Sequence, residues 1–215
     1  MNMPSWLWRL LRACFRDFRE LEELVIIDPL TGLYNRRGMM EKLTGVVNLM
    51  AHQVRRNGEH RRFPTVGVIF LDIDHFKRVN DQYGHPTGDL VLVELARRLR
   101  SMPLRDGDFV VRLGGEELAV ILPQADDAKA RDKAEEILAR IRSVTFATAH
   151  GSQTIAVTVS AGTTAVPILS RMTSEMAWKL LAEQADRALY AAKRRGRDQV
   201  IPFTPDLPAH PEHKE

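Results

Sequence analysis

The chain has 215 residues, 44% of them hydrophobic, which is enough for one ordinary domain with a full core and short appendages. The formal net charge of +3 is mild and does not indicate a nucleic-acid partner. The single cysteine, Cys14, excludes an intrachain disulfide and a cysteine-based metal site, and it fits a reducing cytosol. Since no apolar run reaches the roughly 18 residues of a spanning helix, we expect a cytoplasmic protein.

Residues 1–27 are predicted to form an N-terminal coiled-coil or amphipathic helix. Apolar residues alternate spacings of four and three, as in a heptad seam: Leu7, Leu11, Cys14, Phe18, Leu21 and Val25. Three interpretations stay open. The helix pairs with a second copy, it packs on its own domain, or it lies on an anionic membrane, as two tryptophans and four arginines suggest. The last would make the protein peripheral to the inner membrane.

The segment from Asp28 to Asn35 breaks the helical pattern. Pro29 disfavours helical geometry at the residue before it, and Gly32 permits a left-handed turn. Asn35 can cap a second helix, which we expect over residues 36–56.

An apolar strand is predicted at residues 66–71. It is apolar at every position, so we expect it to be buried on both faces at the centre of a sheet. It runs directly into Asp72-Ile73-Asp74, and burying these carboxylates costs roughly several kcal/mol unless a cation or a donor pairs with them. Either the acids meet such a partner, or the strand has simply surfaced into a loop.

A short helical turn at 75–84 and a helix at 86–100 follow, and Pro86 suits the start of the second. Asn80 and Asp89 flank glycine-containing turns, where short polar residues usually act as caps. Together, however, an amide and a carboxylate can read the edge of a guanine base.

Two glycines separate the β-rich runs 109–111 and 118–122, which predicts a hairpin with a tight turn at Gly114-Gly115. Glu116 and Glu117 stand side by side directly after that turn. Neighbouring acids on a strand usually face water. Alternatively, the hairpin tip carries carboxylates for a divalent cation, and bare glycine backbone lets a phosphate approach.

The remaining elements complete an α+β pattern with a mostly antiparallel sheet of about five strands flanked by helices. We expect a helix over 126–143, a strand over 154–159 that continues at 163–166, a last helix over 173–194 and an edge strand at 200–201. Residues 203–215 are rich in proline, histidine and charge, and we expect a disordered tail there.

In such a fold a central strand ending in Asp72 can neighbour a hairpin tip that carries Glu116. With a main-chain carbonyl such as that of Ile73, these carboxylates would hold one or two Mg²⁺ in an oxygen-only site. Polymerases and nucleotidyl cyclases hold metals that bridge a nucleoside triphosphate in this way.

Five motifs in order resemble those of GGDEF-domain diguanylate cyclases and cover about residues 28–202, the expected catalytic domain. They are Asp28-Pro29-Leu30-Thr31-Gly32-Leu33-Tyr34-Asn35-Arg36-Arg37, Asp72-Ile73-Asp74-His75-Phe76-Lys77-Arg78-Val79-Asn80-Asp81, Gly84-His85-Pro86-Thr87-Gly88-Asp89, Gly114-Gly115-Glu116-Glu117-Leu118 and Ala185-Asp186-Arg187-Ala188-Leu189-Tyr190-Ala191-Ala192-Lys193 continuing to Arg197. The sequence departs from the usual pattern at Leu118, Ala161 and Asp198, which replaces the usual asparagine.

The resemblance implies a nucleotidyl-cyclase or palm-like fold and the condensation of two GTP into cyclic di-GMP, with release of two pyrophosphates. It implies Mg²⁺, or Mn²⁺, held by Asp72, the Ile73 carbonyl and Glu116. Asn80 and Asp89 would read guanine.

The same resemblance assigns the phosphate contacts to Lys77, Lys193, Arg197 and the backbone amides near Phe76. Lys77 and Glu117 are the expected catalytic residues. For Glu117 two roles stay open, since it would help to hold the metal or accept the proton of the 3′-hydroxyl.

The product joins two GTP, whereas one domain holds one. The resemblance therefore implies a homodimer with face-to-face catalytic domains, held together by the N-terminal helix. Arg105 and Asp108 fit the family's product-inhibition site for cyclic di-GMP, although Arg105-Asp106-Gly107-Asp108 by itself is typical of an ordinary turn.

Two alternatives stay open. A non-catalytic nucleotide receptor or dimerisation module would keep the fold without turnover, and its mark would be loss of Asp72, Glu116, Lys77 or Asn80, all of which are present. A cyclase of another product is the second, because guanine reading rests on Asn80 and Asp89 alone.

Overall fold

The computed structural model describes residues 26–57, 63–149, 151 and 153–209. The helix expected over residues 1–27 therefore lies almost wholly outside the described residues. Among the helices that are described, none combines the length and the apolar character needed to cross a bilayer.

The centre of the fold is a five-stranded sheet in the order β2-β3-β1-β6-β7. Only the edge pair β6–β7 is parallel, and the other neighbours are antiparallel. The predicted α+β class with a mostly antiparallel sheet is thus confirmed. The strands are β1 (Thr65–Ile73), β2 (Phe109–Gly114), β3 (Glu117–Pro123), β6 (Val159–Pro167) and β7 (Val200–Pro202).

Strand β1 is central and is buried from Val66 to its end at Ile73. This confirms that the uninterrupted apolar run marks a strand covered on both faces. The strand continues through Asp72, so this acid lies within the sheet and not in a surface loop.

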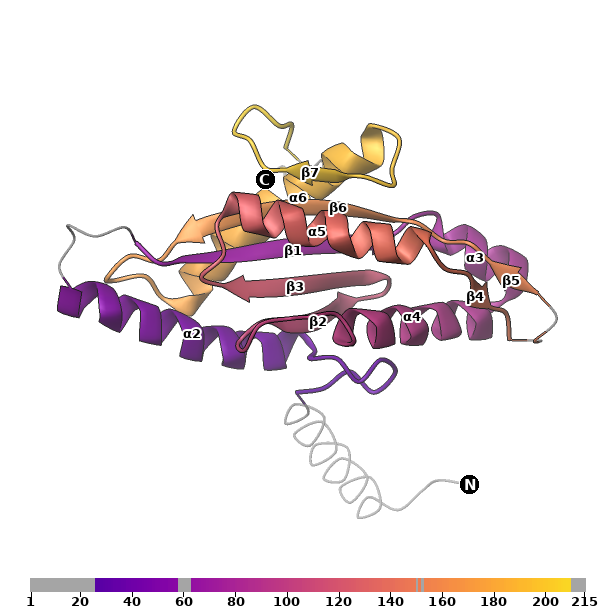
Figure 1. The fold of residues 1–215 in the computed structure, drawn as a ribbon, viewed down its shortest axis with the longest axis horizontal. Helices are drawn as coiled ribbons and strands as arrows, with labels where there is room; N and C mark the ends of the chain where they lie inside the picture. Colours follow the sequence, from indigo (N-terminus) through magenta and orange to yellow (C-terminus); the bar gives the residue numbers. More distant parts are fainter. Residues whose placement is uncertain (1–25, 58–62, 150, 152, 210–215) are drawn as a thin grey trace, which may run out of the picture.

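Helices cover both faces of the sheet (Figure 1). Side chains that alternate along the strands point to opposite faces, and each set packs on its own pair of helices. Ile69 and Leu71 face α4 (His85–Arg100) and α5 (Asp127–Arg142). Val68 and Phe70 face α2 (Arg36–Asn57) and α6 (Ser174–Arg194).

Helix α6 lies unusually close to the sheet at Gly162. A Cβ at this position would lie 2.2 Å from the carbonyl oxygen of Ala185 and 2.3 Å from the amide nitrogen of Leu189. Glycine is therefore required by backbone-to-backbone contact and not by its own torsion angles. This contact sets the distance from the sheet at which α6 carries Lys193.

The strand expected over 154–159 is divided in the structure. Thr154–Ile155 forms β5, which pairs with β4 (Phe146–Ala147) in a separate two-stranded ribbon. The main sheet resumes at Val159, where β6 begins and runs without a break through Gly162. The apolar run at 154–159 forms parts of two strands because its two halves pair with different partners. Hydrophobic periodicity along the chain does not show which strand pairs with which.

The C-terminal segment also differs from expectation, because residues 203–209 are placed and pack on α6. Leu207 is only 4% exposed. The guanidinium of Arg187 lies 5.1 Å from the centre of the Phe203 ring and donates to the carbonyls of Pro205 and Leu207. Two apolar side chains and one arginine suffice to anchor this short segment. The remainder of the expected tail, 210–215, is outside the described residues.

Candidate active site

One end of the sheet gathers the acids that the sequence singled out. Because β1 is antiparallel to both neighbours, its last residues lie beside the first residues of β3 and β6. Asp72 is opposite Glu117 on one side and Ser160 on the other. The loop before β7 reaches the same end, since Val200 pairs with Ala161.

Asp72 is the most deeply placed of these acids, with 5% of the residue exposed. Its Oδ2 lies 2.7 Å from the Nζ of Lys193. Burial raises the pKa of Asp72 to about 6, against the opposing effect of Lys193, and repulsion from Glu116 and Glu117 adds to the rise. One ammonium group thus does not fully compensate the negative charge, so the site electrostatically favours a further cation.

The hairpin tip differs in detail from the expected turn. Gly114 already pairs with Glu117, after a register shift that begins at Arg112, so Gly115 and Glu116 form the turn. Gly115 has φ +48, in the left-handed region that glycine adopts without strain. Glu116 therefore sits in the turn itself, while Glu117 is the first residue of β3.

Arg112 anchors this tip, a role that no local pattern in the sequence indicates. Its Nη1 lies 3.1 Å from each carboxylate oxygen of Asp28, and its Nε and Nη2 donate to the Gly115 carbonyl at 3.0 and 2.9 Å. Asp28 also accepts from the amide and hydroxyl of Thr31. Burial alone would raise the pKa of Asp28, but the hydrogen bonds from Thr31 and Arg112 hold it below its ordinary value.

The expected guanine-reading residues lie on α3 (Phe76–Tyr83) and near the start of α4. A Cβ at Gly88 would lie 2.0 Å from Oδ1 of Asn80 and 3.1 Å from the Phe76 ring. The bare backbone of Gly88 thus receives the Asn80 amide, and Phe76 packs beneath it. Asp89 follows directly and is exposed. The structure therefore brings Asn80, Phe76 and Asp89 into one neighbourhood.

The expected phosphate-binding cations come from three elements. Lys77 is exposed on the first turn of α3, and Lys193 contacts Asp72 from the last turn of α6. Arg197 follows in the loop after α6, has φ +63, and donates its amide to the Ala192 carbonyl at 3.0 Å. Asp198, at the position where asparagine is usual, also has a positive φ of 46°.

Asp74 is a second residue to which sequence reasoning assigned no role. Asp74 is only 6% exposed, and its buried carboxylate accepts three hydrogen bonds. The donors are the Thr158 hydroxyl at 2.7 Å, the Ser160 hydroxyl at 2.6 Å and the Asp198 amide at 3.0 Å. These donors belong to β6, to the residue just before it and to the loop after α6. A signal was present in the sequence, because Asp74 follows a fully apolar strand, but its partners are remote in the chain.

Arg105 and Asp108 do not belong to this cluster. Their turn precedes β2, whereas Glu116 follows that strand, so the two lie at opposite ends of it. Asp108 accepts the amide of Arg105 at 2.8 Å, as in an ordinary turn, and burial raises its pKa. The Arg105 side chain is exposed.

The acidic end of the sheet fits a hard divalent cation by its donor set. Asp72, Glu116 and Glu117 supply only carboxylate oxygens, and the partial neutralisation by Lys193 leaves charge to balance. No three metal-ligating side chains in the described part of the chain already converge on one point. A main-chain carbonyl, such as that of Ile73, and phosphate oxygens would complete the coordination.

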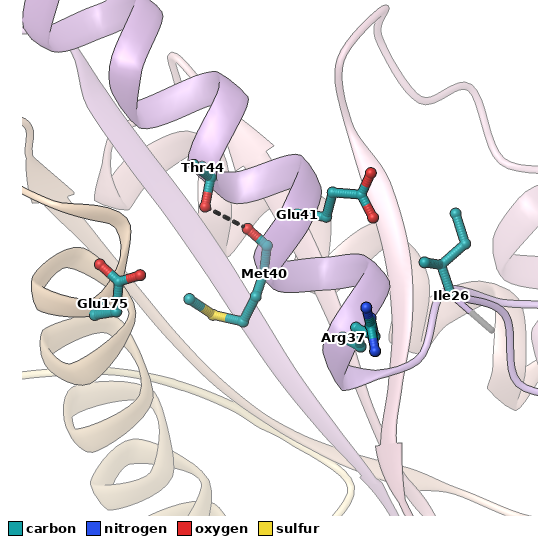
Figure 2. A pocket seen from close by; sticks show the side chains of 6 residues that line it. All are labelled: Ile26, Arg37, Met40, Glu41, Thr44 and Glu175. Atoms are coloured by element: carbon teal, nitrogen blue, oxygen red, sulfur yellow. Dashed lines mark hydrogen bonds between the residues drawn. The ribbon is translucent and has the colours of Figure 1, made fainter. Parts of the chain in front are cut away.

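A hollow of about 710 Å³ lies elsewhere, lined by the N-terminal half of α2, by Ile26 and by Glu175 at the start of α6 (Figure 2). Figure 2 shows Glu175 at one end of it and Arg37 and Ile26 at the other, with Met40, Glu41 and Thr44 of α2 between them. It shares no residue with the acidic end of the sheet and is not part of the candidate active site.

Comparison with known proteins identifies the family. A model described as "Diguanylate cyclase, GGDEF domain" matches residues 25–199. Diguanylate cyclase DgcP of Pseudomonas aeruginosa is 37% identical over 189 residues, which are 88% of this chain and 26% of DgcP. Response regulator PleD of Caulobacter vibrioides is 37% identical over 179 residues, 83% of this chain and 36% of PleD.

Solved structures identify the same family. The GGDEF domain of DgcB from Caulobacter crescentus, in complex with c-di-GMP, superposes with a TM-score of 0.66 at 31% identity, over 82% of this chain and 92% of that domain. The chain belongs to the GGDEF family of diguanylate cyclase domains. It spans about a quarter to a third of the length of the two curated relatives named above.

Proposed function

We propose that this chain is a diguanylate cyclase that condenses two GTP into cyclic di-GMP and two pyrophosphates. The observation that carries the proposal is the junction of β1, β3 and α6, where Asp72 lies opposite Glu117, beside Glu116, and in contact with Lys193. Membership of the family supplies the reaction class, and this junction supplies groups suited to it.

In each half-reaction the 3′-hydroxyl oxygen of one GTP attacks the α-phosphorus of the other. The new O3′–P bond forms as the bond to pyrophosphate breaks, and the hydroxyl proton passes to a base. Such a transfer needs neutralisation of developing charge more than covalent help from the protein. A bound Mg²⁺ or Mn²⁺ would supply Lewis acidity at the phosphate oxygens.

We assign a separate role in this reaction to each residue according to its place in the site. Asp72, Glu116 and the Ile73 carbonyl would hold the cation, and Glu117, exposed at the start of β3, would support it or take the 3′-hydroxyl proton. A base must be within reach of the proton it removes, and Glu117 stands on the open side of the junction. Lys193 would exchange part of its contact with Asp72 for phosphate.

The exposed cations Lys77 and Arg197, with backbone amides near Phe76, would bind the remaining phosphate charge. On the other side, the Asn80 amide and the Asp89 carboxylate would pair with the guanine edge. A carboxylate can accept from both N1–H and the exocyclic amine of guanine, which adenine does not offer in that arrangement.

The reaction requires two domains, since each 3′-hydroxyl must reach the α-phosphate held by the other. We therefore propose a two-fold symmetric homodimer as the active form. The N-terminal helix predicted over 1–27 would raise the effective concentration of one domain near the other.

The decisive experiment incubates the protein with Mg²⁺ and GTP, and separately with ATP, and identifies products by mass. We expect cyclic di-GMP from GTP alone, with specific activity that rises steeply with protein concentration. Nucleotide binding without turnover would favour the receptor alternative, and a cyclic product from ATP would favour a cyclase of different specificity.

Product inhibition is a separate part of the proposal, placed at Arg105 and Asp108. Because this turn lies at the far end of β2 from Glu116, Arg105→Ala should leave turnover at low product unchanged and remove inhibition by added cyclic di-GMP. Initial rates at increasing product concentration measure this. A variant that is inhibited as strongly as the parent refutes the assignment.

A further inference from the structure

The carboxylate of Asp74 joins three segments that would otherwise be independent. It lies one residue beyond β1 and accepts hydrogen bonds from Thr158 and Ser160 and from the backbone of Asp198. Its own amide donates to the Thr158 carbonyl at 2.9 Å. A buried carboxylate with three donors is fixed in place, and so are the donors.

The donor at Asp198 matters most, because it belongs to the loop that carries Arg197. Arg197 and Asp198 both adopt positive φ, a conformation that is unfavourable for residues with a Cβ. Compensating contacts hold the loop in this form. The Asp198 amide reaches Asp74, and the Arg197 amide reaches the Ala192 carbonyl at the end of α6.

A second contact braces the same loop from outside. The Arg142 guanidinium, at the end of α5, lies 2.7 Å from the Asp198 carboxylate and also donates to the Asp198 carbonyl. The usual asparagine at this position would offer no charge to Arg142. The loop is therefore held between a buried acid of the sheet and an exposed arginine of α5.

We propose that Asp74 is a positioning residue that fastens the 196–198 loop to the end of β1, so that Arg197 faces nucleotide phosphates beside Asp72. The proposal rests on the function proposed above for the phosphate-binding cations. It assigns Asp74 neither to the metal nor to proton transfer. Its effect on nucleotide passes entirely through the hydrogen bond to the backbone of Asp198.

Asparagine at position 74 separates this role from metal ligation. Its amide oxygen can accept from Asp198 and Thr158, as Oδ2 does now, and its amide nitrogen can donate to the Ser160 hydroxyl, which can rotate to accept. Asp74→Asn should thus keep the loop in place. Asp74→Ala removes all three hydrogen bonds and should release it.

The experiment measures binding as well as turnover. Affinity is determined, with Mg²⁺, for an α,β-methylene analogue of GTP and for GMP, which lacks the β- and γ-phosphates. For Asp74→Ala we expect about tenfold weaker analogue binding and a higher KM for GTP, the loss expected when a charge-assisted hydrogen bond is removed. GMP affinity and the Mg²⁺ concentration for half-maximal activity should stay within about twofold of the parent, because no base or metal contact changes.

Asp74→Asn should stay within about threefold of the parent for the analogue. Ser160→Ala is the matched control, because it removes one hydrogen bond to the same carboxylate and leaves the loop contact intact. It should change analogue affinity by less than about threefold, as expected for a contact that does not reach the loop.

Two results overturn the proposal. One is an Asp74→Asn variant as inactive as Asp72→Asn with a shifted Mg²⁺ requirement, which would make Asp74 a metal ligand. The other is an Asp74→Ala variant that is less stable but binds the analogue normally below its Tm. Should Asp74→Ala not fold, Arg142→Met provides the test, since loosening the other side of the loop should weaken analogue binding about threefold and spare GMP; an unchanged affinity overturns the proposal.

These binding ratios do not depend on product formation. If the parent makes no cyclic di-GMP, the proposed function fails, while the ratio of analogue to GMP affinity still decides the role of Asp74.

Discussion

The two sides of the candidate site are built differently. On the sheet side, Asp72 and Asp74 are almost fully buried and are fixed by strand pairing, by Lys193 and by hydroxyl groups. On the helix side, Asn80 of α3 is partly exposed and Asp89 is exposed near the start of α4. Under the proposed function, phosphate would meet the buried and paired groups, because preorganised groups in a low dielectric stabilise developing charge most strongly. The guanine base would instead meet an exposed edge, which it could enter and leave.

The sharpest test of this contrast is Asp72→Asn. We expect a fall in kcat of about 10² to 10³, the usual effect of removing one group that stabilises developing charge. Binding of GMP, which depends on the helix side, should change little. Product formation by mass and GMP affinity by calorimetry measure the two effects. Equal losses in both would show that the two sides are not separable.

The raised pKa of Asp72 predicts a pH dependence of stability in the absence of metal. The folded state holds this proton with a pKa of about 6, above the ordinary value of 3.8, so it binds protons more tightly than the unfolded state. The stabilisation is fully present below about pH 4 and is lost as pH rises through 6. It amounts to at most about 3 kcal/mol, since one pKa unit is about 1.4 kcal/mol.

Urea unfolding of the parent and of Asp72→Asn from pH 4 to 7.5 measures the contribution of Asp72 to the free energy of unfolding. The asparagine does not titrate, so the variant should gain stability relative to the parent as pH rises. Adding Mg²⁺ should favour the parent at pH 7. A difference between the two proteins that is constant with pH would contradict the raised pKa.

The close packing of α6 on the sheet side predicts a stability loss for Gly162→Ala. The added Cβ would lie 2.2 Å from the Ala185 carbonyl oxygen, so the helix must move. We expect a loss of about 1–3 kcal/mol, as for overpacked cores. The matched control is Gly45→Ala in α2, where a Cβ meets nothing within 4 Å and alanine should stabilise the helix slightly. Equal effects of the two substitutions would refute the contact argument.

On the helix side, Gly88→Ala should raise the KM for GTP about tenfold, because the added methyl group takes the place of the Asn80 amide and costs about one good hydrogen bond. The stability loss should be smaller than for Gly162→Ala, because the nearest atoms belong to side chains that can move and alanine favours the helix. Initial rates and thermal unfolding of the same sample separate the two effects. An unchanged KM would show that Asn80 does not need this position to serve the substrate.

The sequence predicts those parts of the fold that depend on local patterns. The apolar run before Asp72 predicted a doubly covered strand, and the two glycines after Leu113 predicted a hairpin. The 154–159 run was misjudged because its halves pair with different strands. The segment 203–209 was misjudged because Arg187 of α6, which holds it, lies far back in the chain.

For the site, Asp72 and Glu116 stand out along the chain because carboxylates directly after a buried apolar strand or a glycine turn are unusual whatever the fold. Asn80 is a candidate only in company with Asp89, and Lys193 is assigned only by the resemblance to the family. Roles that depend on contacts between distant segments came only with the tertiary structure: Arg112 joining Asp28 to Gly115, and Asp74 joining β6 to the 196–198 loop. The physical reason is that these interactions act over different distances along the chain. Hydrophobic patterning and turn preferences act over a few residues and can be read along the chain. A hydrogen bond between residues 74 and 198 exists only after the sheet has brought their backbones together.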